Sequence, residues 1–181
     1  MSSRRLVAVL LPGVLGSVLP VVPAGAEPPT YCTGTDVIPV RPGLSLATPS
    51  SGTLQSEGGQ GAEECHGPVD GYQPTGSIRV VHSGLYGYID PDTCGGVEAK
   101  AFAVHSVPTP KGEVDLTNHF TATFKPLSDG VMSGSFTGDH FSGRFVLRPL
   151  EGDCVTSPLT LFEGIWEGTW HGTGSPPPAV R

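Results

Sequence analysis

The stretch VMSGSFTGDHFSGRFVLR, residues 131–148, contains two alternating runs of apolar and polar residues around a central Gly138-Asp139. Alternation with a period of two indicates β-strands, and a Gly-Asp pair between two such runs indicates a hairpin with a two-residue turn. The predicted cross-strand pairs are Phe136 with Phe141, Gly134 with Gly143 and Met132 with Phe145. This arrangement gives one apolar and one polar face, as a half-buried sheet requires.

Residues 161–170, with the sequence LFEGIWEGTW, repeat this alternation. One face carries Phe162, Trp166 and Trp170, and the other carries Glu163, Glu167 and Thr169. The aromatic spacing also fits one face of a helix, but each interior glycine, here Gly164 and Gly168, costs a helix about 1 kcal/mol. We therefore predict a strand whose aromatic residues face the interior and whose glutamates face water.

Shorter alternating runs predict further strands at 53–57, 62–66, 77–81, 85–89, 97–105 and 116–125. Residues 97–105 also suit a short helix, but the flanking Gly95-Gly96 and Pro108 favour a strand. Glycines next to aromatic residues within the strands mark bends or bulges. The sequence therefore predicts an all-β fold of about seven to nine short strands, forming an antiparallel barrel or a strongly coiled sandwich with two disulfides.

The N-terminus has the three parts of a secretory signal peptide. Arg4-Arg5 is positively charged, residues 6–22 are uncharged and mostly apolar, and Ala24-Gly25-Ala26 is a cleavage sequence of small residues. The apolar run is interrupted by proline and glycine and is shorter than a membrane-spanning helix requires. We expect residues 1–26 to be removed and the protein to be secreted, extracellular and without a membrane anchor.

The remaining chain is uneven in composition. Residues 27–76 hold nine Gly and seven Pro in 50 positions, whereas residues 77–171 hold twelve Gly and six Pro in 95 positions. Eleven of the thirteen aromatic residues lie in the second stretch. Because aromatic side chains bury the most area, we expect a β core domain at 77–171, a loosely structured part at 27–76 and a disordered tail at 172–181.

All four cysteines follow the expected cleavage site, and an even number in an exported chain indicates two disulfides. Four cysteines allow three pairings. We favour Cys32–Cys65, which flank the glycine-rich segment, and Cys94–Cys154, which both lie in turn sequences. The cysteines form no C-x2-C pair, so a zinc site is not expected.

The charge excludes some classes of partner. The formal net charge of the chain is −7, and removal of Arg4 and Arg5 makes it −9. Nucleic acids and anionic membranes are recognised by clustered Lys and Arg. We therefore expect no nucleic-acid partner and no membrane association.

The sequence contains no catalytic, metal-binding or cofactor motif. It lacks G-x-S-x-G and H-E-x-x-H. The clusters Glu63-Glu64 with His66, and Asp139-His140, are interpreted as solvated surface rather than as ligand sets. No catalytic residue, metal or cofactor is therefore predicted.

Four aromatic residues are candidates for a ligand platform, namely Tyr86, Tyr88, Trp166 and Trp170. They would stack on a carbohydrate or line a pocket for a small apolar molecule. The favoured alternative is that they pack the core, because the domain has few other large apolar groups.

Two main hypotheses for function follow. A non-catalytic extracellular or envelope binding module, which we favour, predicts an apolar pocket without converging ionisable groups. A small barrel enzyme of the isomerase or cyclase type predicts two or more His, Asp or Glu side chains directed into one cavity. A secreted protease inhibitor, a weaker alternative, predicts an exposed rigid loop braced by a disulfide.

Overall fold

The computed structural model describes residues 29–46, 51–56, 61–88, 94 and 97–172. The predicted signal peptide and most of the predicted tail lie outside these residues. The described part forms nine strands and no helix. The strands are β1 (Thr30–Leu44), β2 (Gly52–Gln55), β3 (Gly61–His66), β4 (Ile78–Tyr88), β5 (Val97–Thr109), β6 (Gly112–Phe124), β7 (Met132–Gly138), β8 (Phe141–Glu151) and β9 (Leu159–Trp170).

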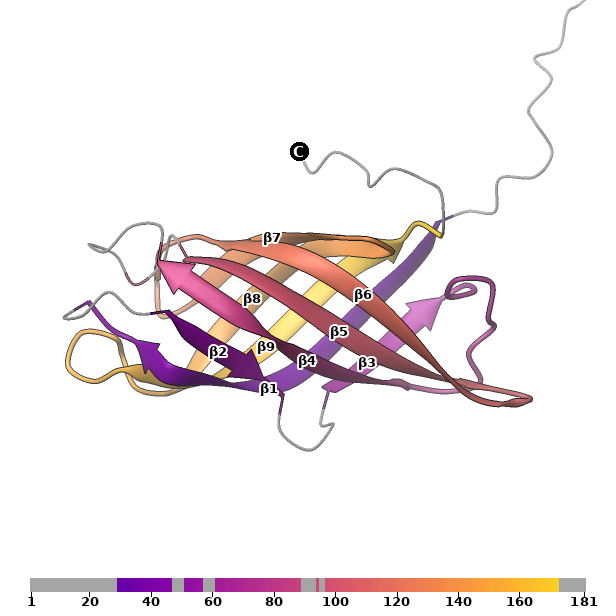
Figure 1. Cartoon of the computed structure of the whole chain (residues 1–181), viewed down its shortest axis with the longest axis horizontal. Helices are drawn as coiled ribbons and strands as arrows, with labels where there is room; N and C mark the ends of the chain where they lie inside the picture. Colours follow the sequence, from indigo (N-terminus) through magenta and orange to yellow (C-terminus); the bar gives the residue numbers. More distant parts are fainter. Residues whose placement is uncertain (1–28, 47–50, 57–60, 89–93, 95–96, 173–181) are drawn as a thin grey trace, which may run out of the picture.

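The strands form a closed antiparallel barrel (Figure 1). Each of β4 to β8 pairs with the next strand along the chain, and β9 closes the barrel by pairing with β1 along most of its length. The short strands β2 and β3 both lie between β1 and β4 and pair with both. The architecture is thus an eight-stranded barrel with one additional strand, which confirms the predicted all-β fold and selects the barrel over the sandwich.

The hairpin of β7 and β8 has a different register from the predicted one. Phe136 pairs with Gly143 and Met132 pairs with Leu147, so the turn is Asp139-His140. Asn118 on β6 fixes this turn, because its Oδ1 accepts the N–H groups of His140 at 3.0 Å and Phe141 at 3.1 Å. The predicted pairs were wrong by two residues, but a shift of two preserves which side chains face inward.

The prediction that residues 27–76 are loosely structured was also wrong, because β1, β2 and β3 lie in this region. Its glycines provide room inside the barrel instead of loosening the chain. A Cβ atom on Gly34 would overlap the Trp166 indole, and a Cβ on Gly61 would press on Val80 and Asp36. Glycine content alone therefore did not distinguish a loop from a strand beside bulky side chains.

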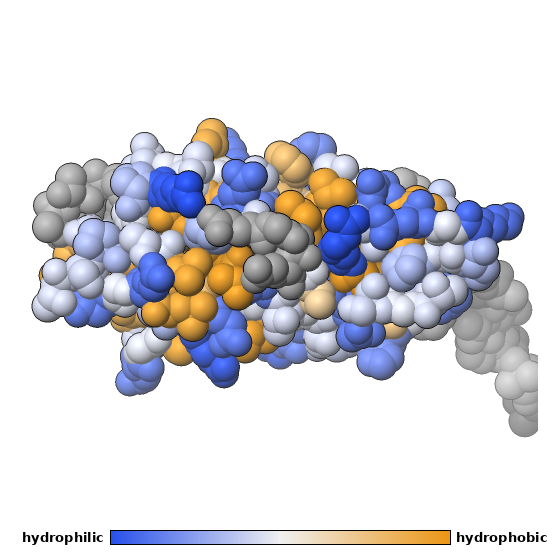
Figure 2. Space-filling model, turned by 90° about the horizontal axis from the view of Figure 1, so that it is seen from below, coloured by the Kyte–Doolittle hydropathy of each residue, from blue (hydrophilic) through white to orange (hydrophobic). Residues whose placement is uncertain are grey.

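The interior face of β9 matches the prediction. Phe162, Trp166 and Trp170 are all buried, whereas Glu163 and Glu167 are partly exposed on the outer face. Residues 97–105 lie in a strand, β5, whose inward residues include Ala99, Ala101 and Ala103. The outer face is mixed, and Figure 2 shows apolar side chains among polar ones on the side that it displays.

The cysteines pair as predicted, Cys32 with Cys65 and Cys94 with Cys154. The first pair links β1 to β3 inside one end of the barrel, with Cα atoms 4.1 Å apart. The second links the β4–β5 and β8–β9 connections at the other end, with Cα atoms 6.2 Å apart. Two such pairs indicate an oxidising, non-cytoplasmic location.

Within the described residues, no helix has the length and apolar character needed to cross a membrane.

Candidate functional site

The barrel encloses a cavity of about 90 Å³. By a comparable measure one water molecule needs roughly 10–15 Å³, so the cavity has room for a small organic molecule. Its lining residues are aliphatic and aromatic, and those whose side chains carry polar atoms are His82, Tyr86, His105, Asn118 and Trp166. No Lys or Arg lines it among the described residues.

The cavity exists because small and large side chains face one another across it. Ala99 and Ala103 on β5, and Ala122 on β6, contribute only methyl groups to the lining. Ala99 and Ala122 are direct cross-strand neighbours, so the side chains on these two adjacent strands extend only a short way into the barrel. The opposite wall carries Phe162 and Trp166 of β9, which leave the remaining space unfilled.

Asp36 and His82 form a buried carboxylate–imidazole pair beside the cavity. Asp36 lies on the inner face of β1, and its Oδ2 is 2.9 Å from Nδ1 of His82 on β4. The Asp36 side chain is completely buried, whereas His82 retains 14% exposure and lines the cavity. The imidazole ring stands edge-on to Trp166, with ring centroids 5.0 Å apart.

Ser56 completes this group. Its hydroxyl donates a hydrogen bond to Asp36 Oδ2 and accepts one from the backbone N–H of His82 at 2.9 Å. The Val37 N–H donates to the other carboxylate oxygen of Asp36 at 2.7 Å. The carboxylate therefore has partners on both oxygens, as burial of a charged group requires.

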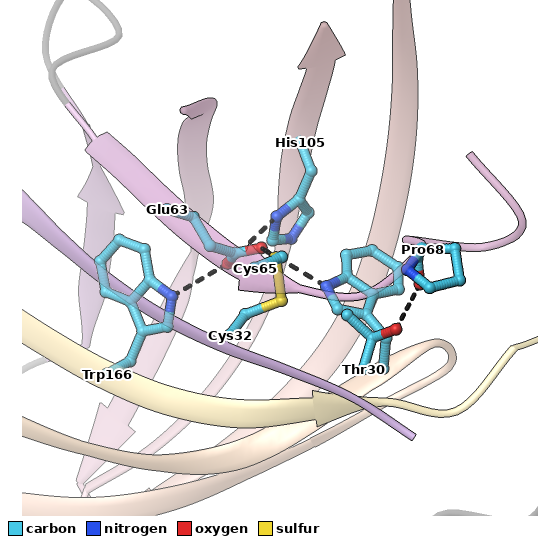
Figure 3. The surroundings of a disulfide bond; sticks show 8 residues. Thr30, Cys32, Glu63, Cys65, Pro68, His105 and Trp166 are labelled. Carbon is cyan, nitrogen blue, oxygen red and sulfur yellow. Dashed lines mark hydrogen bonds and ion pairs between the residues drawn. A yellow bond between two sulfur atoms is a disulfide. The ribbon is translucent and has the colours of Figure 1, made fainter. Parts of the chain in front are cut away.

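A second carboxylate–imidazole pair, Glu63 with His105, lies at the end of the barrel that the Cys32–Cys65 disulfide occupies (Figure 3). Glu63 is completely buried, and its carboxylate accepts the indole N–H of Trp166 at 3.1 Å and that of Trp170 at 3.4 Å. Nδ1 of His105 is 3.5 Å from Glu63 Oε2. Both ring nitrogens of His105 are enclosed by the protein.

This geometry corrects one interpretation from the sequence. Glu63 is an interior residue and not solvated surface, although Glu64 and His66 are exposed. Alternation along β3 explains the difference, because neighbouring residues of a strand point to opposite faces. Cys32, Glu63 and Cys65 also lie close enough to share a metal ion. Because both cysteines are bonded to each other, their sulfur atoms are not available as thiolate ligands.

Three of the four candidate platform residues have described side chains, and these do not form an outer surface. Tyr86, Trp166 and Trp170 are buried, and Tyr86 and Trp166 line the cavity. Trp170 packs face to face on Phe141, with ring centroids 5.4 Å apart, at the end of the barrel that holds the Cys32–Cys65 disulfide. The side chain of Tyr88 lies outside the described part of the structure. An internal role thus replaces surface stacking for the three described residues.

Five polar residues of the interior were not predicted from the sequence, namely Asp36, Ser56, His82, His105 and Asn118. A signal was present for several of them. His82 is on the same strand face as Val80, Gly84 and Tyr86, because these residues are two positions apart. His105 is likewise on the same face as Ala101, Ala103 and Val107. Each histidine therefore occupies an inward position of an apolar face. A polar residue at such a position is costly unless partnered, and it therefore marks a structural or functional network.

One exposed loop is braced by a disulfide, as the protease-inhibitor hypothesis requires. Asp153, next to Cys154, accepts the N–H groups of Val155, Thr156 and Ser157. The loop therefore uses its own backbone donors internally. An inhibitor that pairs with a protease as an added strand needs those donors free, so this loop supports the hypothesis poorly.

Comparisons of the chain with protein-family models, with curated proteins and with solved structures found no match.

Proposed function

We propose that this protein is an exported binding module whose barrel holds a small, neutral, apolar molecule. The observation that supports this proposal is the cavity, which is lined almost entirely by carbon and lies within a framework closed by strand pairing. Water in such a space finds few hydrogen-bond partners, so an apolar occupant displaces it favourably.

The charges around the cavity favour a neutral ligand. Asp36 and Glu63 are both buried close to its wall, and each already faces a histidine. A carboxylate on the ligand would place a third negative charge in the same low-dielectric interior, and none of the described lining residues is a Lys or Arg that could offset it. The carbohydrate alternative is less well supported, because few polar groups are available to replace the hydration of sugar hydroxyls.

Binding can be tested through the intrinsic fluorescence of Trp166, which lines the cavity. Neutral 4-nitroanisole should quench it saturably, whereas the anionic 4-nitrobenzoate and the disaccharide cellobiose should not. N-acetyltryptophanamide measures collisional quenching. Equal quenching by the neutral and anionic probes would contradict the proposal.

A matched pair of variants locates the site. Ala122 faces the cavity and its neighbour Thr121 faces outward. Ala122→Leu should weaken binding of 4-nitroanisole by about tenfold or more because it fills space, which corresponds to roughly 1.4 kcal/mol. Thr121→Leu should leave binding unchanged. Circular dichroism verifies folding, and Ala99→Val is a milder substitute at the same wall.

Secretion is the second part of the proposal. It is supported by the N-terminal sequence and by the two cysteine pairs, which require an oxidising compartment. The mature protein should begin near Glu27. N-terminal sequencing of protein from the culture medium tests this, and a Met1 start would contradict it.

A further inference from the structure

The side chains of Asp36 and His82 are held in fixed orientations by hydrogen bonds, which a group that only fills the core does not need. Asp36 is held from three sides, by the Val37 N–H, the Ser56 hydroxyl and the His82 ring. With Nδ1–H donated to Asp36, the imidazole has its lone pair on Nε2. The carboxylate thus fixes both the orientation and the tautomer of the ring.

Nε2 of His82 is the free end of this arrangement. It makes no hydrogen bond to any described residue, and unlike the nitrogens of His105 it is not enclosed by protein. The ring lines the cavity and is flanked there by Trp166 and Phe120, at centroid distances of 5.0 and 6.2 Å. A basic nitrogen is therefore available beside a mostly apolar cavity.

We propose that His82 is a general base that removes a proton from a neutral molecule bound in the cavity, with Asp36 as its positioning residue. This inference rests on the proposed binding function and extends it to catalysis. It also corresponds to the small barrel enzyme considered from the sequence, because His82 and His105 both line one cavity.

The chemistry of the lining restricts the substrate. In the step, a C–H bond of the substrate breaks, the proton forms an N–H bond at Nε2, and the electron pair stays on the substrate. In the part of the chain that the structure describes, no Lys or Arg lines the cavity, and the Asn118 amide is already engaged by the backbone of the β7–β8 turn. The substrate must therefore delocalise the charge within itself, as a conjugated carbonyl compound does.

Return of the proton to another carbon of the same molecule regenerates the neutral imidazole. The net reaction is an isomerisation that shifts a double bond, and it requires no oxidant, reductant or second substrate. The developing imidazolium is stabilised by the adjacent Asp36 carboxylate, which is the function of a carboxylate behind a catalytic histidine.

The base can be tested with 5-nitrobenzisoxazole, a neutral aromatic compound. Removal of its ring C–H proton forms the nitrile, breaks the N–O bond and releases a coloured nitrophenolate that delocalises its own charge. The protein should catalyse this opening saturably. A positioned general base contributes about 10²- to 10⁴-fold, so His82→Gln should lower kcat about 100-fold or more while KM changes little.

Three further variants separate catalysis from structure. Asp36→Asn should lower kcat about tenfold with KM unchanged, because the ring loses its orienting carboxylate. His82→Gly should be rescued by added imidazole. His119→Gln is the matched control, because His119 faces Asp139 at 3.5 Å in a comparable pair outside the barrel and should have no effect.

Failure of this inference is distinguishable from failure of the binding function. If 4-nitroanisole and 5-nitrobenzisoxazole both quench Trp166 saturably but opening is no faster than in His82→Gln, His82 is not a base and the binding module stands. If neither compound binds, both proposals are wrong. Retained quenching in each variant shows that it still folds.

Discussion

The barrel contains two buried carboxylate–imidazole pairs that differ in what surrounds them. Glu63 and His105 are 3.5 Å apart near the Cys32–Cys65 disulfide, where two indole N–H groups donate to the carboxylate and both imidazole nitrogens are enclosed. Asp36 and His82 are 2.9 Å apart beside the cavity, and the far nitrogen of the imidazole is accessible. A carboxylate paired with an imidazole therefore stabilises the fold in one place and is positioned for chemistry in the other.

The difference shows that the role of a buried histidine depends on the surroundings of the ring nitrogen that does not face the carboxylate. Around Glu63 the indoles and the disulfide use the space, so substitutions there should affect stability most. Around Asp36 the carboxylate serves one imidazole nitrogen and leaves the other open to the cavity. Substitutions there should affect ligand chemistry more than stability. The following predictions test this contrast, from the largest expected effect to the smallest.

Trp170→Ala should have the largest effect. It removes a buried indole, which costs about 3–5 kcal/mol in packing, and it also removes a donor to Glu63. Denaturant unfolding measures the loss, with Trp166→Ala in parallel. An exposed tryptophan would change stability by only about 0.5 kcal/mol, so a variant that unfolds like the parent would show that its tryptophan is not in the core.

Removal of the Cys94–Cys154 disulfide should have the second-largest effect on stability. The cysteines are 60 residues apart in sequence, and closing such a loop is worth roughly 4 kcal/mol in the chain-entropy model. The double substitution to serine should lower the free energy of unfolding by about that amount. Because this disulfide is distant from Glu63, the quenching of Trp166 by 4-nitroanisole should persist under native conditions. Non-reducing peptide mapping should recover this link, and a Cys65–Cys94 link would overturn the pairing.

Glu63→Gln and Asp36→Asn form the direct comparison. Glu63→Gln places an amide where two indole N–H groups need acceptors, and a buried group left unsatisfied costs about 1–3 kcal/mol. Asp36→Asn should destabilise less, since the carbonyl oxygen can still accept from Ser56 or Val37. Urea unfolding of both variants decides, and a larger loss for Asp36→Asn would reverse the assignment of roles.

The smallest expected effect is the loss of stability of the Asp153 loop at low pH. Hydrogen bonds from the Thr156 hydroxyl and then from the backbone N–H groups of the loop hold the pKa of Asp153 at about 2, below its usual 3.8. Because the folded-state pKa is lowered, this contribution to stability is complete above about pH 4 and is lost as the pH falls toward 2. Proton exchange of the loop amides should accelerate across this range in the parent relative to Asp153→Asn, as measured by NMR. A midpoint near 4 in the parent would contradict the assigned hydrogen bonds.

Several features of the fold were predictable because strand periodicity is a local property. The inward direction of Phe162, Trp166 and Trp170 follows from alternation along one strand. The disulfide pairing was also predicted correctly, from the placement of cysteines around turns. The register of the β7–β8 hairpin was not, because Asn118, from a different strand, fixes the turn at Asp139-His140.

The candidate site was less predictable, for a physical reason. Asp36 and His82 lie 46 residues apart in sequence and on strands that are not direct neighbours. Their contact depends on Ser56 of a third segment, which hydrogen-bonds to both. No local sequence pattern encodes a contact between such distant residues. A polar residue at an inward strand position indicated only that a buried polar partner was required.

The sequence by itself determined the all-β class, the faces of the clearest strands and the two disulfides, since these depend on residues close in the chain or on cysteine number. Only the tertiary structure decided barrel closure, the position of Glu63 inside and the accessibility of His82 Nε2. These depend on which side chains share the interior after β1 and β9 meet. Small residues such as Ala99 and Ala122 then leave the space that a ligand can occupy.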